Sequence, residues 1–189
     1  MAGAGVTQAL TLRLARLDDI PALAALIPLS ARGLSAAYYS ARQINSAIRY
    51  VFGVDTQLIM DGTYYIAELD GQIAGCGGWS KRRTLYGGDQ AKDSEDPLLD
   101  PRTEPARIRA FFVHPDSARR GIGSAILLAC FDAAARAGFS RIELMSTLPG
   151  RPLYERFGFG VMERVVVTLK DGVSLPLVRM ARALERVQS

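Results

Sequence analysis

A glycine-rich segment in the second half of the chain has the residue types of an anion-binding site. It contains Arg119, Arg120, Gly121 and Gly123, and Ser124 stands where an apolar helix is predicted to begin. Glycines leave backbone N–H groups open to a ligand, and the first N–H groups of a helix have no partner within it. The helix dipole and the two arginines add positive charge there. We therefore predict a diphosphate-binding loop, with the Ser124 hydroxyl capping the first helical turn.

Two familiar phosphate motifs do not fit this segment. A dinucleotide fingerprint needs a third glycine where this chain has Ile126, and the candidate acid Glu143 lies inside the following strand instead of at its end. A P-loop requires Gly-Lys-Ser/Thr, and no such tripeptide follows Gly121. The glycine spacing by itself leaves open an ordinary helix start with surface arginines.

Composition limits the classes of protein to consider. The 189 residues suffice for one domain whose core needs neither disulfides nor metal. Cys76 and Cys130 are far apart and accompany a single histidine, so we predict no metal site and buried thiols. The first six residues lack the basic region and apolar core of a leader, and no apolar run approaches the ~20 residues that span a bilayer, so we predict a cytoplasmic protein without a membrane partner. The net charge of +4 is dispersed, and nucleic acid is not indicated as a partner.

Hydrophobic periodicity predicts seven strands and four helices. The strands are expected over residues 9–15, 63–69, 72–81, 107–113, 141–145, 161–169 and 173–181, and the helices over residues 18–27, 41–51, 124–137 and 151–157.

The connections between these elements carry further predictions. Pro28 is expected to end the first helix, leaving residues 30–39 as an irregular connection. Residues 83–105 form a long acidic loop. The strand-helix-strand order over residues 107–145 makes those two strands parallel neighbours.

This order of elements resembles the GNAT superfamily of acetyl-CoA-dependent N-acetyltransferases. The resemblance rests on Arg-Arg-Gly-Ile-Gly-Ser at residues 119–124 after a central strand, and on Leu-Tyr-Glu-Arg-Phe-Gly-Phe at residues 153–159 before the last hairpin. The family signature begins with Gln or Arg, where this chain has Ala118. The resemblance implies an α/β (α+β) three-layer fold in a single domain over residues 1–189. Its sheet is mixed, mostly antiparallel and seven-stranded, with a central, splayed parallel strand pair and about four helices.

The resemblance also implies acetyl-CoA as cosubstrate and no metal. Backbone groups of Phe112 and Val113 are then expected to pair with the pantetheine arm in the slot between the splayed strands. The diphosphate is expected to bind at the glycine loop, through Arg119, Arg120, Gly121, Ile122, Gly123 and Ser124.

Catalytic roles follow from the same resemblance. Tyr154 matches the tyrosine that many family members direct at the coenzyme A sulfur, and a phenol is a suitable proton donor for the departing thiolate. The strand that often carries a basic carboxylate has Arg107 and Arg109 instead, so Glu104 just upstream is the nearest candidate base, and proton loss through water is the alternative. We interpret His114 as structural, because it starts the turn into the glycine loop.

The acceptor is predicted to be a primary amine of a small molecule or peptide, bound near Tyr38, Tyr39, Arg82 and Arg109. The arginines suit an acidic group and the acidic loop suits a cation, so the sequence does not choose between them. The resemblance implies a homodimer. Two other classes stay open: a non-catalytic acyl-CoA-binding or sensing module, and a basic protein that binds nucleic acid.

Overall fold

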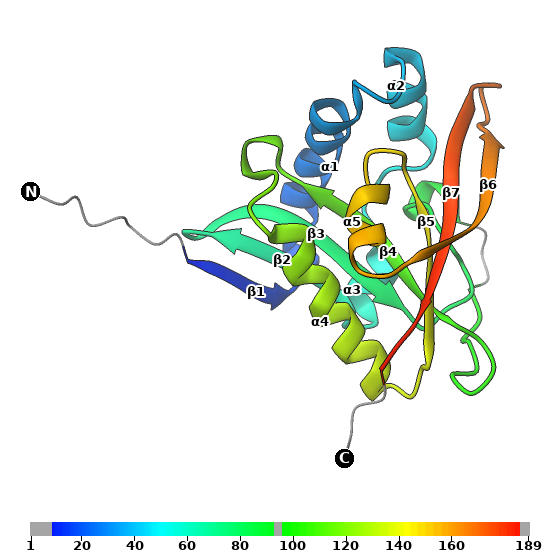
Figure 1. Cartoon of the computed structure of the whole chain (residues 1–189). Coiled ribbons are helices and arrows are strands. Elements are labelled where there is room, and N and C mark those ends of the chain that lie inside the picture. Colours follow the sequence, from blue (N-terminus) through cyan, green and yellow to red (C-terminus); the bar gives the residue numbers. More distant parts are fainter. Residues whose placement is uncertain (1–8, 93–95, 186–189) are drawn as a thin grey trace, which may run out of the picture.

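The computed structural model describes residues 9–92 and 96–185 of the chain (Figure 1). Within these residues, seven strands form one sheet in the order β1-β2-β3-β4-β5-β7-β6. β4 and β5 pair parallel, and the other neighbours pair antiparallel, which confirms the predicted mixed sheet. The strands are β1 Leu10–Leu14, β2 Tyr64–Leu69, β3 Gln72–Ser80, β4 Ala106–Val113, β5 Arg141–Ser146, β6 Gly160–Thr168 and β7 Ser174–Ala183.

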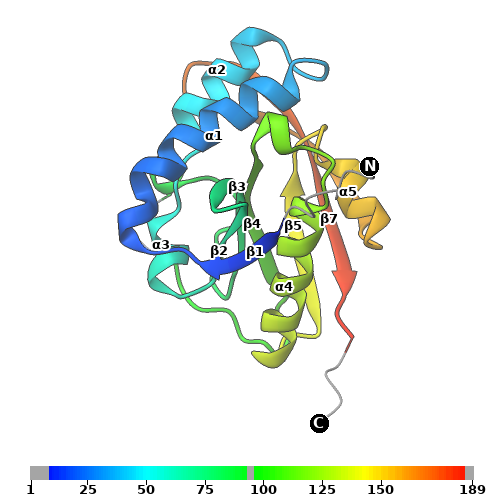
Figure 2. The ribbon, with the colours of Figure 1, turned by 90° about the vertical axis from the view of Figure 1, so that its left-hand side faces the viewer.

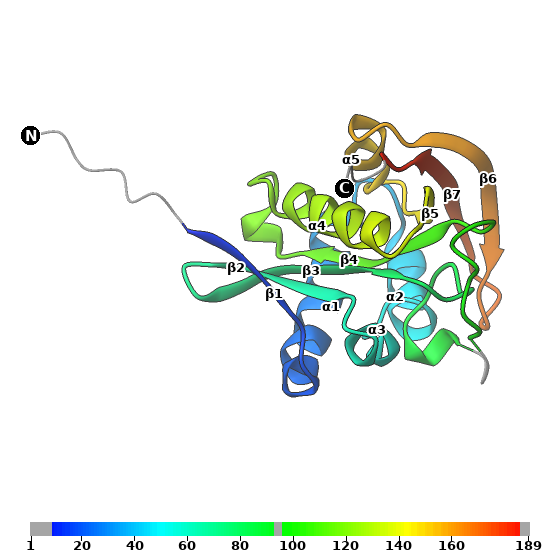
Figure 3. The ribbon, with the colours of Figure 1, turned by 90° about the horizontal axis from the view of Figure 1, so that it is seen from below.

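Helices cover both faces of the sheet, so the fold has three layers (Figures 2 and 3). One face carries α4 and α5, and the other carries α1, α2 and α3. None of the helices in the described residues is long and apolar enough to cross a membrane. The helices are α1 Ile20–Ser35, α2 Ala41–Tyr50, α3 Thr56–Met60, α4 Ile122–Arg136 and α5 Arg151–Arg156.

The first helix differs from its prediction. α1 does not end at Pro28 but continues to Ser35, so most of the expected irregular connection over residues 30–39 is helical. Pro28 removes one intrahelical hydrogen bond. The apolar face nevertheless continues across it, since Leu26, Ile27 and Ala31 are all buried. Tertiary packing of this face therefore outweighs the local effect of the proline.

The sequence also missed α3, whose five residues are too few to show a helical period. Its start is stabilised by Asp55, whose carboxylate accepts a hydrogen bond from the Leu58 N–H. On the same face, α2 begins as predicted after Ser40. The Ser40 and Gln43 side chains form a reciprocal capping box.

A β-bulge in β4 separates it from β5. The two strands pair at Ala106–Ile142 and Arg107–Glu143, and the pairing does not continue along β4. On the other side of β4, Gly78 opposes Arg109 and Cys76 opposes Phe112, so the single residue Gly77 faces two residues of β4. One of these, Ala110, has a φ of 53°. A bulge bends its strand, and the far half of β4 leaves β5 here.

The glycines of β3 make room for this arrangement. A Cβ atom at Gly77 would lie 2.5 Å from the Phe111 ring, and one at Gly75 would lie 2.7 Å from the Ile122 side chain. Glycine at these positions therefore lets the bulged strand and the first residue of α4 pack directly on the sheet.

Candidate active site

A cleft of about 640 Å³ opens where β4 leaves β5. Its volume lies within the range of small-molecule sites, about 300–1,000 Å³. The second half of α1 and the end of β4 form one wall, and the first turn of α4 and the α5 region form the other. The residues that line the cleft include Ser30, Tyr38, Phe111, Phe112, Val113, Arg119, Gly121, Ile122, Gly123, Ser124, Thr147, Tyr154 and Arg156.

The start of α4 at one end of this cleft is open to an anion. Gly121 is the N-cap with a φ of 82°, and no side chain caps the helix, so its first N–H groups remain free of a capping partner. A Cβ atom at Gly121 would meet nothing within 4 Å, so the space over these groups is clear. Arg119 and Arg120 are both exposed, and Arg119 lines the cleft beside these N–H groups, whereas Arg120 is outside the lining. Ser124 is the third residue of the helix and does not act as the predicted cap.

Arg156 is a second cation at this end of the cleft, and the sequence reasoning missed it. It is the last residue of α5, its Nη2 donates to the Ser124 hydroxyl at 2.8 Å, and its guanidinium carbon lies 5.7 Å from the Phe157 ring centroid. Arg156 lies within the segment 153–159 that carries the family resemblance, but its contact with Ser124 of α4 could not be predicted without the fold. Arg119 and Arg156 thus flank the uncapped helix start from two sides.

The unpaired edge of β4 offers backbone groups to the cleft. His114 N–H donates to the Ala74 carbonyl of β3 at 2.8 Å. Backbone groups alternate sides along a strand, so those of Phe112 also face β3 and those of Val113 face the cleft. The Val113 N–H donates to the hydroxyl of Ser30 in α1 at 3.1 Å. Val113 therefore offers the cleft its backbone, and Phe112 offers its side chain.

Tyr154, from α5, also lines the cleft. Its side chain is only 7% exposed and packs edge-on against Phe111 and Phe159, with ring centroids 6.2 Å and 5.6 Å away. Burial, with a smaller contribution from nearby Cys130, raises the pKa of Tyr154 well above its usual value. The phenol is therefore protonated at neutral pH and able to donate a proton.

A second, smaller cavity of about 90 Å³ adjoins the cleft at Tyr154. The two share Phe52, Phe111, Phe112, Thr147 and Tyr154 in their linings. The rest of the small cavity is formed by Val51 and Gly53, by the loop residues Leu85, Tyr86, Gly87 and Gly88, and by Ile108, Arg109, Ala110, Leu144, Met145 and Leu177. A molecule in the small cavity would thus face one in the cleft across the same aromatic wall.

A sequence profile of the Acetyltransferase (GNAT) family matches residues 34–159. The chain belongs to the GNAT acetyltransferase family. No curated protein matches the chain. Solved GNAT structures share its fold at low sequence identity, which extends the likeness in architecture from β1 to β7.

Three of these GNAT structures illustrate the range. A GCN5-related N-acetyltransferase from Rhodopseudomonas palustris is 20% identical, with 96% of this chain and 100% of that chain covered and a TM-score of 0.69. The PaiA N-acetyltransferase of Thermoplasma acidophilum, solved with coenzyme A, is 14% identical, with 93% and 99% covered and a TM-score of 0.62. The putative acetyltransferase YncA of Salmonella typhimurium, solved with acetyl-CoA, is 17% identical, with 96% and 97% covered and a TM-score of 0.61.

The residues predicted to bind the acceptor in this GNAT chain do not come together. Arg109 lines the small cavity, while Tyr38 is half exposed and lines the large cleft. Tyr39 is buried, and its hydroxyl links the segment after α1 to β7 and to the segment after β5. It donates to the Pro176 carbonyl at 2.7 Å and accepts from the Leu148 N–H at 2.9 Å. Arg82 lines neither cavity and instead forms a salt bridge with Asp61 at 2.7 Å.

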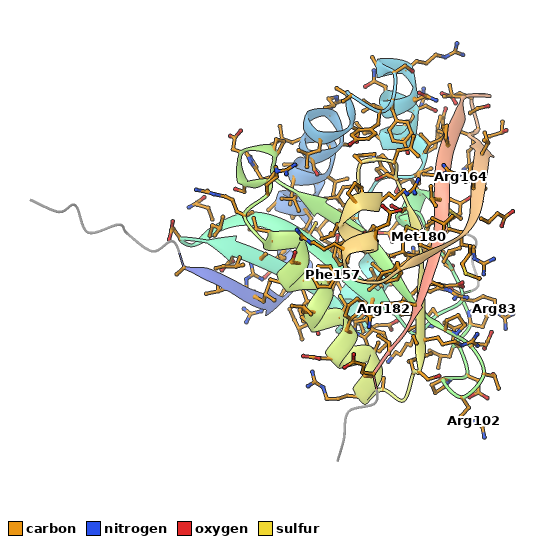
Figure 4. The ribbon with its side chains drawn as sticks, in the orientation of Figure 1. Arg83, Arg102, Phe157, Arg164, Met180 and Arg182 are labelled. Carbon is orange, nitrogen blue, oxygen red and sulfur yellow. The ribbon has the colours of Figure 1, made fainter. Side chains whose placement is uncertain are left out.

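Glu104, the candidate base, also lies outside both linings. Glu104 comes just before the end of β4 that pairs with β5. Tyr154 instead packs against Phe111, which comes after the bulge in β4. The Glu104 carboxylate accepts from the Asp100 N–H at 2.9 Å and lies 3.7 Å from the Arg83 guanidinium. Figure 4 shows Arg83 at the right-hand edge of the molecule, away from Phe157 at the end of α5.

Proposed function

We propose that the protein transfers an acetyl group from acetyl-CoA to a primary amine of a small molecule or peptide, by direct attack within a ternary complex. One observation carries this proposal: Tyr154 stands in the wall shared by two cavities, and the larger one ends at an uncapped, glycine-lined helix start. Such an arrangement suits a diphosphate-bearing donor on one side and an acceptor on the other. Coenzyme A or acetyl-CoA in similar GNAT structures supports the choice of donor.

The residues of the large cleft fit coenzyme A chemically. N–H groups of Ile122, Gly123 and Ser124 would bind the diphosphate, with Arg119 and Arg156 supplying charge. The Val113 N–H would hold a pantetheine carbonyl once the Ser30 hydroxyl releases or shares it. These contacts would orient the acetyl thioester, which is the chemistry that the donor brings, toward Tyr154.

Tyr154 would act on the leaving group. In the transfer, the amine nitrogen bonds to the acetyl carbon, the carbon–sulfur bond breaks, and the sulfur leaves with its electron pair. The protonated phenol of Tyr154 can give its proton to that sulfur and regain one from the solvent. Backbone N–H groups near the end of β4 would stabilise the charge on the carbonyl oxygen.

Proton loss from the amine would go to water. The described residues that line the two cavities include no carboxylate and no histidine, and Glu104 is outside both. A lysine-like amine, with an ordinary pKa of about 10.4, would therefore react in its minor unprotonated form. The rate at limiting amine should rise with pH until the amine itself is neutral.

Thiol release from acetyl-CoA, measured with a broad panel of primary amines, tests the proposal. We expect amine-dependent thiol release and a stoichiometric N-acetyl product by mass spectrometry. The absence of a carboxylate from the described linings favours one other candidate, a non-catalytic acyl-CoA sensor. Tight binding of acetyl-CoA by calorimetry without turnover on any amine would overturn the transferase and support the sensor.

We also propose a homodimer, as the family resemblance implies, located in the cytoplasm, as the sequence composition predicts. Light scattering coupled to size-exclusion chromatography measures the mass in solution directly. A mass equal to one chain at micromolar concentration would contradict the dimer.

A further inference from the structure

We propose that the acceptor is a small primary amine whose remaining part is apolar and carries no second charge. This inference rests on the proposed function, because it assigns the small cavity beside Tyr154 to the acceptor. It concerns the question that the sequence left open, whether the site prefers an acidic or a cationic molecule.

Most of the side chains that line the small cavity are apolar. Val51 and Phe52 come from the segment after α2, Leu85 from the loop after β3, and Met145 and Leu177 from β5 and β7. Two hydroxyl-bearing residues, Thr147 and Tyr154, also line the large cleft, and a third, Tyr86, lines the small cavity alone. The amine must react beside Tyr154, and most of the other side chains in the lining offer apolar contact.

Arg109 is the charged side chain among the described residues that line this cavity, and its charge is already matched. Its guanidinium is almost completely buried, with Nη2 2.9 Å from a carboxylate oxygen of Asp55. Nη1 donates to the Thr84 carbonyl at 2.8 Å, and Nη2 donates to the Gly87 carbonyl. Nε has no hydrogen-bond partner, but protein atoms enclose it. Arg109 therefore holds the loop over the cavity and does not offer its charge to a ligand.

The acidic residues of the loop are committed in the same way. Asp89 accepts from the Thr56 N–H at 3.0 Å, and Asp96 accepts from the Thr84 N–H at 2.7 Å. Neither lines the cavity. Asp100 pairs with Arg102 and Glu104 lies near Arg83, and neither acid lines the cavity. Outside the loop, the buried Asp55 also pairs with Lys92. The loop acids Asp93 and Glu95 lie outside the described residues. Among the described residues, then, the lining holds no carboxylate and its arginine is already paired, so neither a second ammonium nor a carboxylate on the acceptor would find a partner there.

Charge and size together define the class of acceptor. Burying an ion without a partner is strongly unfavourable, so an added ammonium or carboxylate must weaken binding. A cavity needs about 10–15 Å³ to hold one water molecule. The small cavity of about 90 Å³ therefore holds about six to nine water-sized groups. This suits an amine of similar size, such as a branched or linear five-carbon amine.

The test uses matched acceptors with the full chain and saturating acetyl-CoA. Pentylamine is compared with 1,5-diaminopentane, which adds an ammonium, and 3-methylbutylamine is compared with leucine, which adds a carboxylate. We expect each uncharged-tail amine to have a kcat/KM about 100-fold above its charged partner. Turnover that favours the diamine or leucine would overturn this inference alone. Acetyl-CoA binding without turnover on any amine would overturn the proposed function as well.

A variant locates the effect in the cavity. Leu85 is half-buried on the loop, so Leu85→Glu places a carboxylate in the lining, with Leu85→Gln as its matched control. We expect the ratio of kcat/KM for 1,5-diaminopentane to that for pentylamine to rise about ten-fold or more in L85E relative to L85Q. An unchanged ratio, in variants with wild-type thermal stability, would show that the acceptor binds elsewhere. If either variant fails to fold, the comparison of matched amines on the wild-type protein still decides the inference.

Discussion

Replacing Tyr154 with phenylalanine removes the proposed proton donor and little else. The ring packs between Phe111 and Phe159, and Tyr154→Phe keeps that packing. No group in the described residues hydrogen-bonds the Tyr154 hydroxyl, so its loss should change the free energy of unfolding by less than about 1 kcal/mol. The structure therefore separates a catalytic effect of this variant from a folding effect.

The expected loss of activity is large. A positioned proton donor contributes about 100-fold to 10,000-fold in rate, and because the hydroxyl acts only as the sulfur leaves, the loss should fall on kcat. The KM for acetyl-CoA should change less than about three-fold, since the diphosphate end of the cleft is untouched. Burial raises the pKa of Tyr154, so its protonated form is present throughout the neutral and mildly alkaline range. The wild-type rate should consequently show no alkaline decline caused by this residue.

Steady-state thiol release by the wild-type protein and Tyr154→Phe checks this, with Tyr65→Phe as the matched control. Tyr65 is partly buried and lies outside both cavity linings, so removal of its hydroxyl should leave kcat within about two-fold. A Tyr154→Phe variant that folds normally and keeps a third or more of the wild-type kcat would refute the assignment of Tyr154 as the acid.

Three further predictions concern the glycine loop before α4 and two ion pairs, Arg109–Asp55 and Arg82–Asp61. Gly121→Val, which forces a branched side chain into a φ of 82°, should raise the calorimetric Kd for coenzyme A more than Arg119→Ala does, and the reverse ranking would contradict binding by backbone N–H groups. Asp55→Ala leaves a buried guanidinium without its counter-charge and should lower the free energy of unfolding in urea by about 3–5 kcal/mol. Burial alone would raise the pKa of Asp61, but hydrogen bonds, chiefly from Arg82, lower it overall, so the stabilisation is present above about pH 4 and lost in more acidic solution. Arg82→Gln should thus destabilise the protein near neutral pH and have little effect at about pH 2, and equal losses at both pH values would contradict this.

The features of the fold that could be predicted are those determined by residues close together in the sequence. The alternation of apolar residues fixed the strands, and Asp70-Gly71, both with positive φ, forms the expected hairpin turn. The glycines of the loop before α4 were predicted as an opening for an anion, and Gly121 indeed has the left-handed conformation that glycine tolerates best. The failure at Pro28 has the opposite origin, because burial against distant strands decided the length of α1.

The acceptor side could not be predicted, because its charges are balanced by partners far away in the sequence. Arg109 and Asp55 are separated by the whole of β2 and β3, and Asp96 bonds to a backbone group across the loop. Counting arginines and acids gave two conflicting interpretations of the acceptor. Our proposal of an acceptor without a second charge rests instead on the contacts of the described residues: the small cavity is lined by no carboxylate, and Arg109 is already paired with Asp55.

The bulge in β4 links the two halves of the site. Without the extra residue at Ala110, side chains beyond it would face the opposite sides of the sheet, because strand residues alternate with a period of two. With it, Arg109 and Ala110 both line the small cavity, Phe111 turns toward Tyr154, and the Val113 backbone turns toward the cleft. The same distortion that opens the large cleft therefore also brings Arg109 into the lining of the small cavity, so the two proposed binding sites share one structural cause.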